Sequence, residues 1–247
     1  MLPVATNLRI IKTPCVTYTI VAANVLIHFV VTWNTNFVIS DRVARTFGFN
    51  PTSFGNLSAI PTLVTSMFLH GDLLHLLGNM VFLLVFGRRV ENQLEGINFL
   101  TFYLTTGISA CLAHMFMQPN SSSPLIGASG AISGVLGAFF ICNPRARITV
   151  VLEPVLIYFL HRLIIRVPAW IFLPIWLLLQ ISTGLKPQAS NVAFWAHVGG
   201  FVAGAVISVA VYKYISKTRP YQFGNRSFFN PNAAFVTGCS TSPRSTS

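Results

Sequence analysis

Long apolar segments with almost no charged side chains recur along this chain and limit what it can fold into. A helix needs about 20 apolar residues to cross the hydrocarbon layer of a membrane, and fewer where neighbouring helices shield it. Six segments are candidate spans: residues 16–33, 72–86, 99–117, 129–142, 169–181 and 193–215. The sequence therefore predicts an all-α membrane protein, a bundle of six transmembrane helices in which the fourth is short.

The amino-acid composition also indicates that most of the chain faces an environment other than water. Apolar residues make up 53% of the chain and charged residues 9%, against about 25% charged in soluble domains. The mean hydropathy is +0.66. These values exclude an ordinary soluble enzyme and a disordered protein. The net charge of +11 comes from bases spread along the chain without a run of five, so we expect a lipid bilayer as partner and no nucleic acid.

The Lys and Arg residues indicate the orientation, because cytoplasmic loops of membrane proteins are enriched in them. With the N-terminus in the cytoplasm, 13 of the 16 bases lie inside and three lie outside, namely Arg42, Arg45 and Lys186. We therefore expect both termini in the cytoplasm and the long loop 34–66 on the outer side.

The first apolar segment is long enough to span, and we recognise neither a signal-peptide cleavage site nor an organelle presequence. The prediction is a multi-pass protein of a bacterial cytoplasmic membrane. Its parts are a cytoplasmic N-terminus (1–15), a membrane domain (16–215) and a disordered cytoplasmic tail rich in Ser, Asn, Pro and Thr (216–247).

One further apolar stretch, residues 148–167, is interrupted by Glu153, Pro154, Arg162 and Arg166. We interpret it as a loop or an interfacial segment. The alternative, that it spans, would reverse the last two spans and move the bases near residues 213–219 outside, which the positive-inside rule disfavours.

A few polar residues lie at membrane depth, where each is costly and therefore indicates a function or a specific hydrogen bond. In the predicted orientation they all enter from the outer side, and they are His70, Asp72, His75, Asn79, Ser129, Ser133 and His197. Their convergence on one side indicates a site near the outer face.

His75 and Asn79 are four residues apart and share one helix face. They are compatible with hydrogen bonds between helices, or with a pair of donors aimed at a developing anion. We expect no metal and no other cofactor, because an H-E-x-x-H pattern is lacking and only Asp72 is near.

The fourth segment begins with Ser129 and carries Gly130, Gly134 and Gly137, a stripe that lets another helix approach closely. Ser129 is compatible with a small packing residue, or with a nucleophile at a helix start where free N–H groups gather. The segment spans about 21 Å of a layer about 30 Å thick, so we expect its outer end in a cavity that water enters.

The sixth segment carries a G-x-x-x-G face, Gly200 and Gly204, and His197 lies on that face. Packed on the glycine stripe of the fourth segment, this face brings His197 toward Ser129. The two are a candidate nucleophile and base, although a lone intramembrane histidine also serves as a hydrogen-bond partner between helices. No acid is available for a triad, so the prediction is a Ser–His dyad whose histidine is oriented by packing.

At these residues the chain resembles the rhomboid family of intramembrane serine proteases, over roughly residues 70–213. Three motifs carry the likeness: His70, His75 and Asn79 match H-x4-H-x3-N, residues 127–130 match G-x-S-G, and residues 196–204 match A-H-x-x-G-x-x-x-G. Their order on three different spans makes the likeness specific. The six-helix topology of the family, with its N-terminus inside, agrees with the charge distribution.

The resemblance implies a role for each matched residue. Ser129 is then the nucleophile, and His197 is the general base and later the acid for the leaving amine. The implied oxyanion hole consists of His75, Asn79 and the backbone N–H of Ser129. The supporting residues are Gly127, which lets the loop approach the substrate, His70, which is structural, and the packing glycines Gly130, Gly200 and Gly204.

Two positions depart from the family pattern. Ser133 stands where some members carry a Tyr that stacks on the catalytic histidine, and Glu91 is followed by Gly96, one place later than in E-x3-G.

The predicted function is an intramembrane serine endopeptidase that cleaves transmembrane segments of single-span or multi-span substrates near the outer face. The alternative is a catalytically silent relative that binds membrane clients. A transporter or channel is disfavoured, because it would need charged groups along the bundle and the inner halves of these spans have almost none.

Overall fold

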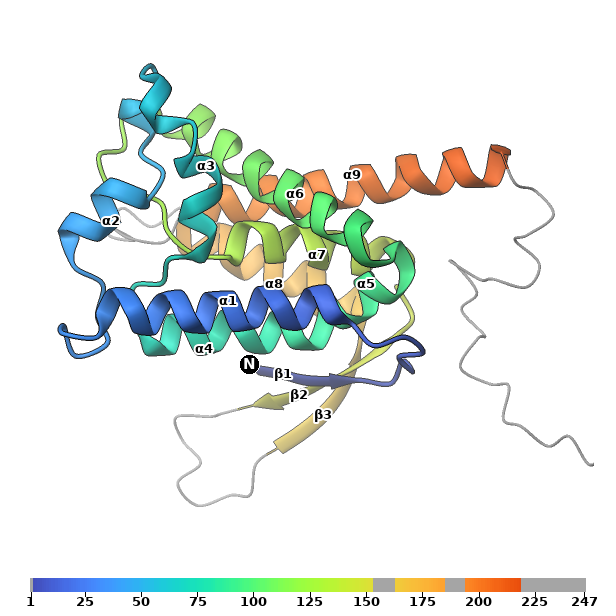
Figure 1. Ribbon diagram of the computed structural model, residues 1–247. Helices are drawn as coiled ribbons and strands as arrows, with labels where there is room; N and C mark the ends of the chain where they lie inside the picture. The colour runs from blue at the N-terminus through green and yellow to red at the C-terminus, as the bar shows by residue number, and fades with distance from the viewer. Residues whose placement is uncertain (1, 153–162, 185–193, 219–247) are drawn as a thin grey trace, which may run out of the picture.

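The computed structural model describes residues 2–152, 163–184 and 194–218. Apolar helices run side by side in a bundle, and a small sheet lies beside them (Figure 1). The predicted disordered tail from residue 219 onward, and the centre of the 148–167 stretch, fall outside the described residues.

Four helical stretches in the described part of the chain are long and apolar enough to cross a membrane: Cys15–Thr32 (α1), Leu73–Leu94, Gly96–Met117 (α6) and Phe194–Val211, within α9 (Phe194–Thr218). Two shorter apolar helices accompany them: Ser129–Cys142 (α7) and Ala169–Ser182, within α8 (Ala169–Gly184). The chain is therefore a mostly helical integral membrane protein.

The second of these stretches is longer than predicted. It runs through α4 (Leu73–Phe82), a π-helical turn η4 (Leu83–Gly87) and α5 (Arg88–Leu94), and so passes the expected end at residue 86. The charged residues of α5 belong to the same continuous helix, because the turn at Glu95 and Gly96 follows them. Both residues have a positive φ, 64° and 31°, and glycine is suited to that conformation.

Helix α7 forms the centre of the bundle, and each of residues 130–139 is buried. It packs between α6 and α9. A Cβ on Gly200 of α9 would overlap the carbonyl oxygen of Gly130, and one on Gly204 would overlap that of Gly134. The predicted contact between the two glycine faces is therefore present.

The glycine stripe of α7 serves two neighbours instead of one. A Cβ on Gly137 would overlap the carbonyl oxygen of Phe201 on α9, whereas a Cβ on Gly134 would overlap the side chain of Thr106 on α6. The stripe thus lets two helices, α6 and α9, approach α7 closely.

A three-stranded antiparallel sheet lies against α4, η4 and α8, in the order β1 (Leu2–Thr6), β2 (Arg147–Leu152) and β3 (Leu163–Pro168). β1 pairs with β2 from Leu2↔Val151 to Thr6↔Ile148, and β2 pairs with β3 from Arg147↔Pro168 to Leu152↔Leu163. The all-α prediction, and the interpretation of 148–167 as a loop, are wrong at these strands, whereas the interpretation as an interfacial segment stays a prediction. The reason is that the β-branched run after Arg147 pairs with a strand at the distant N-terminus.

The start of α1 is capped by a carboxylate from another helix. Glu91 of α5 is 5% exposed, and it accepts hydrogen bonds from the backbone N–H groups of Val16 (2.9 Å) and Thr17 (2.7 Å). These N–H groups have no carbonyl partner inside α1, and a negative charge is favourable at a helix N-terminus. Glu91 therefore ties α1 to the α4–α5 helix.

The segment between α1 and α4 holds the chain just before α7. Phe49 exchanges two backbone hydrogen bonds with Leu125 (2.9 and 2.7 Å), and Gly127 N–H donates to Ser66 C=O (2.9 Å). The short helices of this segment are α2 (Asp41–Phe47), η1 (Pro51–Ser53), η2 (Leu57–Ala59), α3 (Thr62–Thr65) and η3 (Ser66–Phe68).

Candidate active site

Ser129 and His197 meet where the first turns of α7 and α9 lie together. Ser129 is the first residue of α7, His197 lies in the first turn of α9, and Ser129 Oγ is 2.8 Å from His197 Nε2. His197 is 9% exposed. A serine hydroxyl at this distance from an imidazole nitrogen can pass its proton to the ring as the oxygen attacks a substrate.

The loop that leads into Ser129 requires glycine at position 127. Gly127 has a φ of 120°, which side chains rarely adopt, and a Cβ there would lie 3.0 Å from both Cε1 and Nε2 of His75. The intrahelical bonds of α7 start with Ile132 N–H to Ala128 C=O (2.9 Å). The N–H of Ser129 precedes that bond and can donate to a developing anion.

His75 turns its Nε2 toward this loop. Its Nδ1 accepts a hydrogen bond from Gly71 N–H (3.3 Å), so in the neutral ring the proton resides on Nε2. The Nε2 nitrogen faces Gly127, next to Ser129. The hydrogen bond from Gly71 thus selects the tautomer that can donate near the serine.

Asn79 lies one turn further along α4 and is 7% exposed. One of its amide hydrogens goes to His75 C=O (3.0 Å), and the amide has a second hydrogen to donate. Asp72 is the N-cap of α4, because its carboxylate accepts from His75 N–H (2.8 Å). Asp72 thus stabilises the start of the helix that carries His75 and Asn79.

The remaining nitrogen of His197 contacts a residue that the sequence analysis missed. His197 Nδ1 is 3.2 Å from Oε1 of Gln180 on α8, and the ring of Trp176, one turn earlier, lies 6.2 Å away between centroids, tilted by 39°. The available signal was a glutamine within an apolar segment, where a polar side chain is costly. Ser133 does not replace the missing aromatic ring, because its hydroxyl donates to Ser129 C=O (2.7 Å).

His70 lies before α4, fully buried, with its ring 5.2 Å from that of His75 in an edge-to-face contact. Burial, together with the neighbouring His75 and His28, lowers the pKa of His70 from 6.5 to about 3. The complete burial of His70 and its ring contact with His75 fit the structural role that the resemblance implies. His28 of α1, also fully buried, was not singled out in the sequence analysis.

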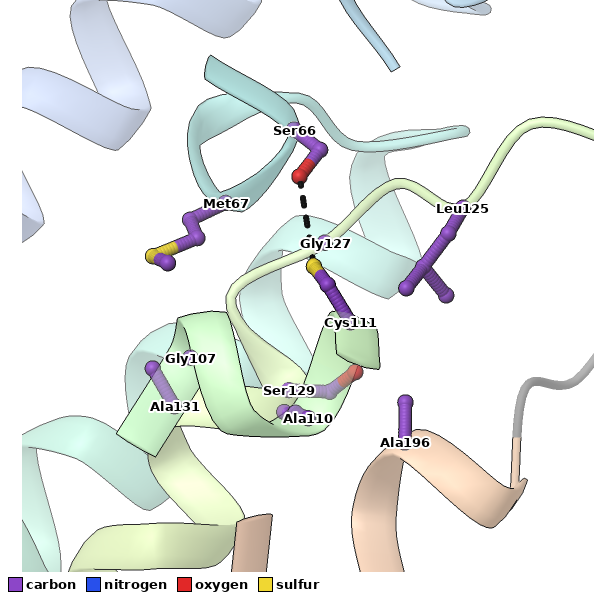
Figure 2. Close-up of a pocket in the computed structure, with 11 residues that line it drawn as sticks. Ser66, Met67, Gly107, Ala110, Cys111, Leu125, Gly127, Ser129, Ala131 and Ala196 are labelled. Atoms are coloured by element: carbon purple, nitrogen blue, oxygen red, sulfur yellow. Dashed lines mark hydrogen bonds between the residues drawn. The ribbon is translucent and has the colours of Figure 1, made fainter. Parts of the chain in front are cut away.

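Ser129 borders two hollows. The larger one is a cavity between helices, lined by His75, Asn79 and Phe82 of α4, Ser129, Ile132 and Ser133 of α7, Trp176 and Gln180 of α8, and His197 of α9. The smaller one lies on the side of α6, near Ser66, Met67 and Cys111 (Figure 2). Within the described ranges, no three His, Cys, Asp or Glu side chains are arranged to hold a metal ion.

The fold and this pair of residues define the class: a multi-helix membrane protein with a serine–histidine hydrogen bond inside its bundle. Residues 58–214 match the family model described as the Rhomboid domain. That match covers more than half of the chain, so the chain belongs to the rhomboid family.

Curated relatives agree with the family. RHOMBOID-like protein 5 of Arabidopsis thaliana is 28% identical over 148 residues, which are 58% of this chain and 41% of the relative. Rhomboid protein 1, mitochondrial, of Saccharomyces cerevisiae is 27% identical over 166 residues, 64% of this chain and 44% of the relative. Rhomboid protease GluP of Bacillus subtilis is 27% identical over 198 residues, which are 80% of this chain and 35% of the relative. The matched region thus spans less than half the length of each of these relatives.

Proposed function

We propose that this protein is an intramembrane serine endopeptidase that cleaves peptide bonds in or beside transmembrane segments of single-span or multi-span membrane proteins. The observation that carries the proposal is the 2.8 Å hydrogen bond between Ser129 Oγ and His197 Nε2, inside an apolar bundle. The rhomboid domain and the relative named a rhomboid protease support the same reaction class.

In the first half of the reaction, Ser129 Oγ attacks the carbonyl carbon of the peptide bond while His197 Nε2 takes the hydroxyl proton. The carbonyl oxygen becomes an oxyanion. Its proposed donors are His75 Nε2–H, the free amide hydrogen of Asn79 and the backbone N–H of Ser129. The C–N bond then breaks, and the proton on His197 moves to the leaving amine.

In the second half, water hydrolyses the ester formed on Ser129. His197 takes a proton from the water as the water oxygen attacks, and returns it to Ser129 Oγ when the second tetrahedral species collapses. The cavity beside Ser129 is the proposed route for substrate and water, because it borders the serine, the histidine and both side-chain donors.

The proposal includes six spans, formed by α1, the α4–α5 helix, α6, α7, α8 and α9, with both termini in the cytoplasm. At 1.5 Å per residue the 14 residues of α7 extend about 21 Å, less than the layer of about 30 Å. Ser129, at the outer end of α7, then lies below the membrane surface, and cleavage occurs near the outer face.

Labelling with a membrane-impermeant thiol reagent tests this topology on a background without native cysteines. A cysteine introduced in the loop 34–66 should react from outside intact cells, and one at the C-terminus should not. The bacterial cytoplasmic membrane stays a prediction, because the relatives include a mitochondrial yeast protein as well as a Bacillus subtilis protein.

The direct test of the activity uses the purified full chain in detergent with a model single-span substrate and a fluorophosphonate probe. We expect the wild type to cleave the substrate and to be labelled, and Ser129→Ala to do neither. Ser109→Ala is a matched control, because that hydroxyl donates to Thr105 C=O of its own helix, α6 (2.9 Å), and should leave both readouts unchanged.

A catalytically silent protein that binds membrane clients would retain the substrate without cleaving it, and the probe would not label its serine. Substantial cleavage by Ser129→Ala would remove Ser129 from the mechanism.

A further inference from the structure

The ring of His197 is held at both nitrogens by side chains from two other helices. Nε2 faces Ser129 Oγ on α7 (2.8 Å), and Nδ1 faces Gln180 Oε1 on α8 (3.2 Å). Both lie within hydrogen-bond distance. The position of the ring therefore depends on α8 as well as on the glycine contact between α7 and α9.

The chemistry of the imidazole determines what Gln180 does. A neutral ring carries one proton, and the nitrogen without it is the acceptor. Ser129 can pass its proton to Nε2 only if Nε2 is free of hydrogen, and this requires the proton on Nδ1. The hydrogen bond that Nδ1 makes decides which tautomer is present, and an amide oxygen is a suitable acceptor for Nδ1–H.

We propose that Gln180 is a positioning residue for His197: its side-chain oxygen accepts the Nδ1 proton and keeps Nε2 open toward Ser129. This inference rests on the proposed protease function, since it concerns the same serine and histidine. Gln180 does not touch the reacting atoms and acts through the ring of His197.

The surroundings of Gln180 support this role. It is half-buried, on the wall of the cavity that contains Ser129 and His197, and it follows the apolar residues 177–179. A glutamine in such a helix is costly unless its amide has a partner. Trp176, four residues earlier on the same helix face, contacts the same histidine, so two successive turns of α8 meet His197.

Three carboxylates in the described part of the chain interact with groups other than His197. Asp72 caps α4, Glu91 caps α1, and Glu95 pairs with Lys12 (2.6 Å). Within residues 2–152, 163–184 and 194–218, the side chain on Nδ1 of His197 is an uncharged amide. An amide orients the ring but adds no negative charge to stabilise the imidazolium. Its loss should therefore cost less than the factor of about 10⁴ known for the aspartate of a catalytic triad.

The test compares Gln180→Leu, which has no acceptor, with Gln180→Glu, which keeps an oxygen at a similar distance. Ser182→Ala is the control, because it lies one half-turn further on α8 and its hydroxyl donates to Leu179 C=O (3.0 Å). The readouts are kcat, KM, the rate of fluorophosphonate labelling and ¹⁵N NMR of histidine-labelled protein in detergent. The signals of His197 are identified by their loss in His197→Asn.

We expect Gln180→Leu to lower kcat and the labelling rate about 10–100-fold, below the loss of a triad aspartate, with little change in KM. In its spectrum the proton of His197 should move from Nδ1 to Nε2. Gln180→Glu should keep the proton on Nδ1 and retain most of the rate, and Ser182→Ala should behave as the wild type. A purely structural role for Gln180 would change thermal stability without moving the proton.

Two results would overturn the role of Gln180: a wild-type spectrum in which His197 lacks the Nδ1 proton, or a Gln180→Leu variant with wild-type rate and tautomer. An equal loss of rate in Gln180→Leu and Gln180→Glu would also count against it. Failure of the proposed function looks different, because the wild type itself would neither cleave nor be labelled while its spectrum still reported the Nδ1 contact.

Discussion

Gly204 of α9 lies directly against Gly134 of α7, so close that a Cβ on Gly204 would overlap the Gly134 carbonyl oxygen. Gly200 has the same relationship to Gly130, the residue after Ser129. The distance between Ser129 and His197 is therefore set by two backbones in contact. A side chain at Gly200 or Gly204 would therefore separate the two helices that carry the pair.

We predict that Gly204→Val and Gly200→Val each lower cleavage at least about 100-fold, although neither glycine has a reactive group. A displacement of about 1 Å at a catalytic pair is sufficient for a loss of that size. Gly55→Ala is the control, since no atom lies within 4 Å of a Cβ built there. The measurement is turnover per folded molecule, and near-normal cleavage by both valine variants would show that this contact does not position the pair.

The approach of His197 to Ser129 could be predicted from the sequence because small residues at every fourth position mark the helix faces that touch. Both residues lie on such a face, so packing the faces brings the side chains together. The long apolar segments likewise predicted α1 and α6 to within a few residues, since Cys15–Thr32 and Gly96–Met117 are nearly the expected ranges.

Gln180 and the sheet could not be found in the same way. A glutamine in an apolar helix can face lipid, a cavity or a neighbour, and the rotation of α8 about its own axis decides which. β1 pairs with a strand far away in the sequence, and hydrophobic periodicity reports local structure alone. The cap that Glu91 provides for α1 could not be predicted for the same reason, because it joins residues from two helices far apart in the sequence.

A second prediction concerns this cap. Glu91→Gln should lower the free energy of unfolding by about 2 kcal/mol, because a buried, charged acceptor of two N–H groups is replaced by a neutral one. Glu95→Gln is the matched control: Glu95 pairs with Lys12 at the surface, with side chains 58% and 65% exposed, and should cost less than about 1 kcal/mol. Denaturation of the purified variants in detergent measures both, and equal effects would contradict the capping role.

A third prediction concerns the dyad as a unit. Ser129→Ala and His197→Ala should each abolish cleavage, and the double variant should be no slower than either one, because the base has no function without its nucleophile. Residual rates and melting temperatures are measured on the same preparations. Independent, multiplying losses would mean that the two residues act separately despite their hydrogen bond.

The last prediction concerns the oxyanion donors. His75→Ala and Asn79→Ala should lower kcat more than they raise KM, because such donors meet their partner fully only in the transition state. Loss of one donor typically costs about 100–1,000-fold. With two side chains and the Ser129 N–H sharing the charge, each single loss should lie at or below about 100-fold.

Asn79 also has a structural bond, from its amide to His75 C=O four residues earlier, so part of any effect will appear as lost stability. Asn98→Ala separates the two contributions, because Asn98 makes the same kind of bond to Leu94 C=O (3.1 Å) on a surface away from the site. It should change the melting temperature slightly and leave the rate per folded molecule intact. Asn79→Ala or His75→Ala could instead lower the melting temperature and leave turnover at the wild-type value. The residue replaced in that variant would then stabilise the helix bundle and would not stabilise an oxyanion.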